Sequence, residues 1–425
     1  MKFVVIVSII STVLISNYVG VSNNIHSIVY GLEIYFILTL LYNIDKRLSI
    51  GDFIVLMAST MYLLVPALMF DLDVQATMPP NLFGYDILAI EPEIYFKFGI
   101  WSIMLFHFSF LTIKSFTTRK KVLDAIEALQ SNYDVEKVIK IFLIIASISL
   151  LLKGTVSSLN LVFFLGIKLS NLIIVLSLFL KEPRKERRYL FIGLAIMLFF
   201  TARSAMFGDA FYMLVFYVLF RGVTKGYSIQ AKVVAPIIGV AFASFITLFK
   251  GAYISIVWGS ETKGGIVGFA QTLTNLFSSF NEDVFMIGIN ASLYRLNQAY
   301  LSSLTMEQVP KNVSFENGET LLETLYSFVP RFFWPGKPIL SDRSTMIKYA
   351  GYTPTESASM GIGQLGESYV NFGFIGGALW MMVYGLTIAL VIRYFLKYSK
   401  INIGIVFLPM LLFYAMKPET MFSKV

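Results

Sequence analysis

The stretch VPRFFWPGKPILSDR, residues 329–343, gathers cations, prolines and aromatic rings within an otherwise apolar chain. Its cations are Arg331, Lys337 and Arg343, and its aromatic run ends at Trp334. The prolines stiffen the segment, because proline fixes φ and disfavours helix. A stiff cationic segment suits a phosphate-bearing ligand, since arginine binds phosphate through two hydrogen bonds, and the rings suit packing against sugars. The alternative is an anchor at lipid headgroups.

Further cations lie outside this stretch. Arg295 and Lys348 belong to the same long polar region, and Arg203 stands in TARSAM where two apolar segments meet. Arg203 has three interpretations: contact with lipid headgroups, binding of an anion in an aqueous cavity, or an ion pair with Asp209. The sequence leaves these alternatives open.

The elements that must position these residues are membrane helices. Hydrophobic residues make up 56% of the chain and charged residues 14%, which is typical of an integral membrane protein. Because a spanning helix needs roughly 20 apolar residues, we predict an all-α polytopic protein of about eleven spans. They are residues 3–19, 27–44, 53–70, 94–113, 139–152, 159–180, 189–202, 205–220, 231–249, 371–392 and 401–416.

Three domains follow from this pattern. Residues 1–249 form an N-terminal bundle of about nine helices, residues 250–366 one large extracytoplasmic loop, and residues 367–425 the C-terminal helices. The loop is too rich in apolar and aromatic residues for disorder, and an amphipathic helix is expected over residues 266–280.

Basic residues collect at 114–121, 181–188 and 393–400. We expect all three clusters on the cytoplasmic side, with a cytoplasmic N-terminus, because positively charged loops are retained there. The net charge of +8 is therefore a signal of topology, and nucleic-acid binding is excluded for want of a basic soluble domain. There is no cysteine, and we find no metal-ligand spacing and no phosphate-binding loop.

Three patches resemble one known family. VPRFFWPGKP, GIGQLGESYVNFGFIGGALW leading into a span, and TARSAM are similar to the Wzy-type O-antigen and oligosaccharide repeat unit polymerases. The resemblance covers the whole topological plan and implies a bacterial inner-membrane glycosyltransferase of GT-C architecture. It implies repeat units carried by undecaprenyl pyrophosphate on the periplasmic face, and no metal or other cofactor. Relatives often have one more C-terminal helix, so twelve spans are the alternative count.

The implied reaction joins a sugar hydroxyl to the anomeric carbon of a lipid-linked glycan. It needs cations for the leaving pyrophosphate and a carboxylate for the hydroxyl proton. For the cations we select Arg203 and Arg331, with Arg343, Lys337, Arg295 and Trp334 as binding residues. Glu367 in GESYVNFG is the candidate base, with Glu356 and Asp342 as substitutes. The alternative role of Glu367 is a helix-start residue stabilised by the macrodipole.

Other functions remain open. An O-antigen ligase shares the plan, but such ligases resemble one another in a loop histidine, whereas His26 and His107 both lie outside the loop. A non-enzymatic transporter or flippase for lipid-linked glycans would also need cations for the pyrophosphate. The resemblance implies membrane lipids, a chain-length regulator and a flippase as partners.

Overall fold

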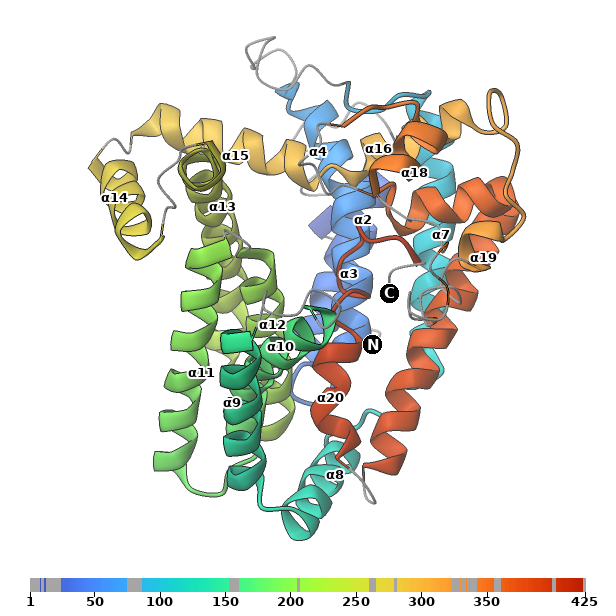
Figure 1. Cartoon of the computed structure of the whole chain (residues 1–425). Coiled ribbons are helices and arrows are strands. Elements are labelled where there is room, and N and C mark those ends of the chain that lie inside the picture. Colours follow the sequence, from blue (N-terminus) through green and yellow to red (C-terminus); the bar gives the residue numbers. More distant parts are fainter. Residues whose placement is uncertain are drawn as a thin grey trace.

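The computed structural model is a bundle of helices (Figure 1). It describes residues 8, 11–12, 24–74, 86–152, 160–204, 207–259, 265–278, 281–322, 329, 334, 336, 342–354, 361–399 and 403–422. Over these residues the regular structure is helical, apart from one isolated bridge between Arg47 and Thr118.

One half of the bundle is built around α19, which packs most extensively on α7. Its elements are α2 (Asn24–Asn43), α3 (Ile50–Ser59), the π-helical turn η1 (Thr60–Leu64), α4 (Val65–Asp71), α7 (Pro92–Leu111), α19 (Gly363–Tyr398) and α20 (Gly404–Leu411). The helix α19 is kinked at Gly373, whose φ of 66° lies in the left-handed region that favours glycine. The kink leaves the first part of α19 free to pack on α16.

The other half is organised around α10, which packs against α9, α11 and α12. Its elements are α9 (Val135–Leu152), α10 (Asn160–Ser177), α11 (Pro183–Ser204), α12 (Phe207–Lys225) and α13 (Ile229–Gly259). A buried apolar core runs through both halves, and a separate cluster of Phe207, Phe249 and Tyr253 joins α12 to α13.

Short helices cover the two ends of the bundle. At one end lie α14 (Gly265–Ser278), α15 (Glu282–Leu296), α16 (Gln298–Gln308) and α18 (Asp342–Ala350), with α15 crossing from α14 towards α16 (Figure 1). Asn281 and Asn297 begin α15 and α16, where their side chains accept hydrogen bonds from free backbone N–H groups. The opposite end carries α8 (Arg119–Asn132), which lies across the base of the bundle, and we call it the α8 end.

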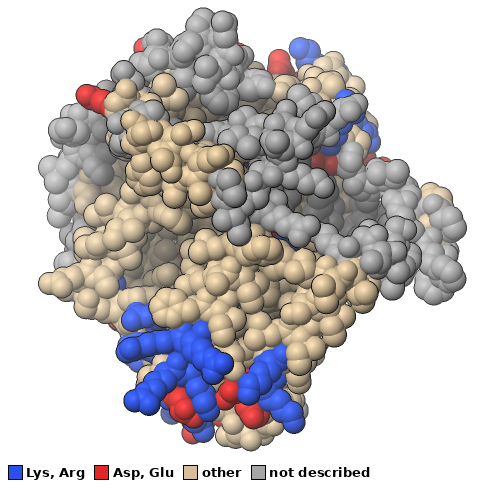
Figure 2. All heavy atoms as spheres, turned by 60° about the vertical axis from the view of Figure 1, so that its left-hand side comes forward, with Lys and Arg blue, Asp and Glu red and all other residues tan. Residues whose placement is uncertain are grey.

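The three basic clusters share the α8 end, as predicted. Arg393 lies 4.1 Å from the ring of Phe116, and Arg119 donates a hydrogen bond to the carbonyl of Thr224. Lys225, next to that carbonyl, pairs with Glu186. Figure 2 shows Lys and Arg gathered at this end, below a broad face of uncharged residues. An uncharged band bordered by cations is the pattern of a membrane-spanning bundle.

The number of spans differs from the prediction. Among the described residues, six helices are long and apolar enough to cross a membrane: Asn24–Asn43, Ile50–Asp71, Pro92–Leu111, Phe207–Lys225, Ile229–Thr247 and Gly363–Tyr398. Helices also occupy the predicted spans at 139–152, 159–180 and 189–202, but α9 and α11 begin with charged turns and the apolar part of α10 is short. The predicted span at 401–416 contains only the eight-residue α20. The span at 3–19 lies almost wholly outside the described residues.

The boundary predicted at Lys250 falls inside a helix. α13 continues to Gly259, because the residues that follow Lys250 remain apolar and Phe249 and Tyr253 pack into the cluster with Phe207. The amphipathic helix expected over residues 266–280 is confirmed as α14.

Candidate functional site

Charged side chains from five parts of the chain meet within the bundle. Asp209 on α12 accepts hydrogen bonds from Lys168 on α10 and from Lys417, whose Nζ lies 3.2 Å from Oδ1. All three side chains are at most about a fifth exposed. Lys417 also lies 4.1 Å from the ring centroid of Phe413, an arrangement that stabilises a cation through the aromatic face.

Three further charged residues lie near the group of Asp209, Lys168 and Lys417. Lys250 on α13 and Arg295 on α15 lie near Glu419. The charges of Arg295, Lys417 and Asp209 in turn affect the pKa of Lys250. We call this group the cationic cluster, with the members Lys168, Asp209, Lys250, Arg295, Lys417 and Glu419. Its four cations outnumber its two carboxylates, so the cluster carries an excess of positive charge that would favour an anion.

The environment shifts the pKa values of Lys250 and Glu419 in opposite directions. Burial first, and then the neighbouring cations Arg295 and Lys417, lower the pKa of Lys250 to about 8. Burial also raises the pKa of the Glu419 carboxyl, against the effect of nearby Lys417, Arg295 and Lys250. Oε2 of Glu419 is buried and has no hydrogen-bond partner in the described part of the chain. An amine and a carboxyl with shifted pKa values, side by side, are suited to proton transfer near neutral pH.

The C-terminal segment, residues 417–422, holds two members of the cluster in place. Tyr62 in η1 donates a hydrogen bond to the carbonyl of Pro418, and the amide of Gln364 donates to the same oxygen at 3.1 Å. The side chain of Gln364 reaches the carbonyl of Lys417 at 3.2 Å. The segment is therefore hydrogen-bonded to both α19 and η1, and these bonds fix the positions of Lys417 and Glu419.

Glu367 also holds the C-terminal segment in place through a hydrogen bond. Its side chain is completely buried, Oε1 accepts a hydrogen bond from Thr320 at 2.8 Å, and Oε2 accepts one from the amide of Phe422. Asn371 donates to Thr320 at 2.7 Å and accepts from the amide of Gly318 at 2.9 Å. Both carboxylate oxygens of Glu367 thus join α19 to neighbouring segments, a geometry that favours a positioning role over that of a base.

The other predicted site residues fall in several places. Arg295 lies in the cationic cluster. Arg343 is in the first turn of α18, and its Nε is buried. The start of α18 lies near the cluster, because Asp342 and Glu419 both approach Gly361. A Cβ built at Gly361 would lie 3.5 Å from Oδ1 of Asp342 and 3.1 Å from the carbonyl oxygen of Glu419. Trp334 is 37% exposed.

Several predicted residues lie outside the described part of the chain. They are Arg331, Lys337, Glu356 and the side chain of Arg203, whose backbone ends α11. The proposed ion pair between Arg203 and Asp209 therefore stays a prediction. Lys168 and Lys417 already bind Asp209 in the structure.

Sequence reasoning missed Lys168, Lys250, Lys417 and Glu419 as site residues. Their signal was ionisable character inside or beside apolar segments, which is costly facing lipid and marks a bundle interior. In the described residues no group of three His, Cys, Asp or Glu side chains is placed to hold a metal ion.

The part of the chain that the structure describes is all-helical and has six helices fit to cross a membrane, which is the architecture of a helical membrane protein. Within that class, residues 104–412 match the family described as a domain of unknown function, DUF8712, and the chain belongs to this family. No curated protein and no solved structure matches the chain.

Proposed function

We propose that this protein is a membrane-embedded glycosyltransferase that polymerises lipid-linked oligosaccharide repeat units. The substrates are units carried on undecaprenyl pyrophosphate, and the product is an O-antigen or a related surface polysaccharide. The observation that carries the proposal is the cationic cluster, where Lys417, Arg295 and Lys250 lie near the carboxyl of Glu419 and Lys168 pairs with Asp209. Excess buried positive charge suits a pyrophosphate, and an adjacent carboxyl suits transfer of a proton.

The cations and the carboxyl have separate roles in the proposed reaction. A hydroxyl of one repeat unit attacks the anomeric carbon of the other, the bond from that carbon to the pyrophosphate breaks, and the lipid pyrophosphate leaves with the electron pair. Lys250, Arg295 and Lys417 stabilise the charge on the leaving group. Glu419 takes the proton of the attacking hydroxyl. Glu367 positions Glu419 by holding the C-terminal segment.

The residues of the 329–343 stretch complete the site in this proposal. Arg331, Lys337 and Arg343 bind phosphate, Trp334 packs against the glycan, and Arg203 joins them from the end of α11. Support comes from α18, whose first residues lie near the carbonyl of Glu419.

In the membrane, the proposal assigns GT-C architecture and eleven spans. The α8 end, with its basic clusters, faces the cytoplasm of a bacterial inner membrane and the N-terminus lies on the same side. Residues 3–19, the helices α9, α10 and α11, and the whole segment 401–416 that contains α20 then cross together with the six helices of sufficient length and apolarity. A flippase would supply the substrate and a chain-length regulator would act on the product.

The test is complementation of a strain that lacks this gene, with surface polysaccharide separated on a gel. Lys417→Ala and Arg295→Ala should reduce the ladder of long chains to a single repeat unit at equal expression. Lys348→Ala is the matched control, because this lysine is 54% exposed and pairs with Glu316 outside the cluster. Normal ladders from both cluster variants would exclude the site.

The same gel separates the alternatives. If the deletion abolishes surface glycan while lipid-linked polymer accumulates, the protein is a ligase or an export component. A transporter would instead leave single lipid-linked units on the cytoplasmic side.

A further inference from the structure

A row of titratable side chains runs through the core between α2, α3–α4 and α7. Asp52 lies in the first turn of α3 and Asp71 ends α4. At 1.5 Å per residue they stand about 28 Å apart along the helices, close to the roughly 30 Å thickness of a bilayer's hydrocarbon core. Glu33 and His107 lie between them, buried at 3% and 6% exposure. Ionisable residues at such depth are costly and mark functional paths.

The α4 end of the row is hydrogen-bonded. Nδ1 of His26 lies 2.9 Å from Oδ1 of Asp71, and the hydroxyl of Tyr30 donates to Oδ2 of Asp71 at 2.6 Å. Leu72, the next residue, is 53% exposed, so this group adjoins the surface at the end of α4. Glu33 follows Tyr30 by three positions and therefore shares its face of α2. Tyr30, Asp71 and His26 therefore form a hydrogen-bonded group on the α4 side of Glu33.

Glu33 has one free oxygen. Its Oε1 accepts a hydrogen bond from Thr60, whereas its Oε2 is buried without a partner in the described residues. Oγ of the neighbouring Ser59 is also buried and unpaired in the same set. A proton on Oε2 would remove the buried charge and provide a donor beside Ser59.

The backbone at this level is unusual as well. Thr60 begins the π-helical turn η1, and Tyr62 in that turn holds the C-terminal segment. Turns of this kind are rare and occur frequently at functional sites. The protonatable carboxyl and the irregular backbone therefore coincide at the middle of the row.

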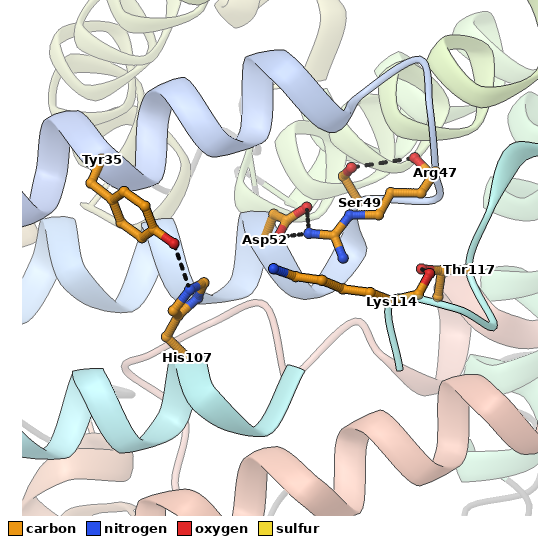
Figure 3. Close-up of polar contacts among 7 residues, drawn as sticks. All are labelled: Tyr35, Arg47, Ser49, Asp52, His107, Lys114 and Thr117. Atoms are coloured by element: carbon orange, nitrogen blue, oxygen red, sulfur yellow. Dashed lines mark hydrogen bonds and ion pairs between the residues drawn. The ribbon is translucent and has the colours of Figure 1, made fainter. Parts of the chain in front are cut away.

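The α8 end of the row is different, because it is positively charged. Figure 3 shows His107 bonded to Tyr35, with the Lys114 side chain extending past the guanidinium of Arg47 towards Asp52. Arg47 binds both oxygens of Asp52, at 2.6 and 2.8 Å. Two cations thus stand beside one carboxylate. A fixed excess of positive charge is a barrier to protons, as in channels that exclude them.

We propose that Glu33 is a proton-binding site inside the membrane bundle, reached from the α4 end through Tyr30, Asp71 and His26 and closed towards the α8 end by Arg47 and Lys114. The proton enters as the free ion, binds Oε2 and leaves by the same route, so no bond other than O–H forms or breaks.

The groups that face Glu33 are few. From α3 and η1 they are Ser59 and Thr60, both neutral, and from α2 itself Tyr30 lies one turn nearer the α4 end. From α7 the nearest titratable group is His107, which packs on Phe36 at 5.1 Å between ring centroids, about one turn below Glu33. No charged group among the described residues pairs with Glu33, so its protonation follows the pH at the α4 end.

The experiment is infrared spectroscopy of the full chain in lipid nanodiscs. As the pH falls, the difference between the spectra of the wild type and Glu33→Gln should show one carbonyl band of a protonated carboxylic acid, while the bands of other carboxyls such as Glu419 cancel. Glu33→Asp, which keeps the acid, should move the band, and this second variant guards against a folding defect in the first. Glu93→Gln is the control, since Glu93 is exposed on α7 and pairs with Lys97.

A pH jump tests the route. Tyr30→Phe should slow the rise of the band severalfold, whereas Lys114→Ala should leave its rate unchanged. A difference spectrum without this band would refute the site, and an unchanged rate in Tyr30→Phe would refute the route. A band displaced by Na⁺ at constant pH would show a cation site in place of a proton site. None of these outcomes depends on whether the protein polymerises glycans.

Discussion

The ion pair between Arg47 and Asp52 offers a sharp test of burial, because the chain contains a matched pair at the surface. Arg47 and Asp52 lie 2.6 Å apart with side chains 10% and 4% exposed. Lys97 and Glu93 lie at the same distance with side chains 58% and 59% exposed. The two pairs differ chiefly in solvent access.

Asp52→Asn keeps the shape of the side chain and removes its charge. Two charges at about 4 Å interact by about 4 kcal/mol at an effective dielectric constant near 20, and loss of one partner of a buried pair typically costs about 3–5 kcal/mol. We therefore expect a loss of stability in this range, increased by Lys114, which then stands beside an unpaired Arg47. Glu93→Gln should change stability little, because solvent screens an exposed pair.

The assay is thermal unfolding in detergent, followed by circular dichroism, for both single variants and for Arg47→Met with Asp52→Leu. The double variant should recover much of the loss, since it leaves no buried charge behind. If Asp52→Asn lowers the melting temperature no more than Glu93→Gln does, the reasoning about burial is wrong.

Two further predictions concern packing and pH. Gly222→Ala should destabilise the protein by about 1–3 kcal/mol, the usual range for overpacking, because a Cβ there would lie 2.4 Å from the carbonyl oxygen of Ile44. Gly239→Ala, with open space around it, should be neutral or stabilising, and equal melting temperatures for the two would contradict this. Burial would raise the pKa of Glu316, but Lys348 holds it below its usual value, so their pair stabilises the fold at neutral pH and is lost on acidification. The small difference in melting temperature between the wild type and Lys348→Ala should therefore vanish in acid, and a difference that persists there would refute the pairing.

The positions of the helices could largely be predicted from the sequence. The mostly apolar stretches at 27–44 and 94–113 became α2 and α7 within a few residues, because a helix is the way to satisfy backbone groups in an apolar setting. The end of α13 was harder, since Lys250 interrupts the apolar run without ending the helix. A single charged residue does not end a helix when the residues on both sides of it pack against neighbouring helices.

The site was predictable only in part. The pattern singled out Arg295 as a candidate binding residue, but it could not show that Lys168, Asp209 and Lys417 meet, since 41 and 208 positions separate the bonded pairs. Periodicity tells which face of a helix is apolar, and says nothing about which polar groups of distant helices come together. The hydrogen bonds of Glu367 to Thr320 and to the amide of Phe422 could not be predicted either, because these partners lie 47 and 55 positions away.

The hydrogen bonds that hold the C-terminal segment, residues 417–422, have a consequence for biogenesis. The hydroxyl of Tyr62 bonds to a carbonyl 356 positions later, so the early helices enter the membrane long before their last partner is synthesised. During that interval the aromatic side chains that later receive Phe422, including Trp380 and Tyr384, have no such cover. Assembly of the bundle must therefore finish after translation has passed residue 422. A chain stalled earlier would present an unfinished interior to the quality-control proteases of the membrane.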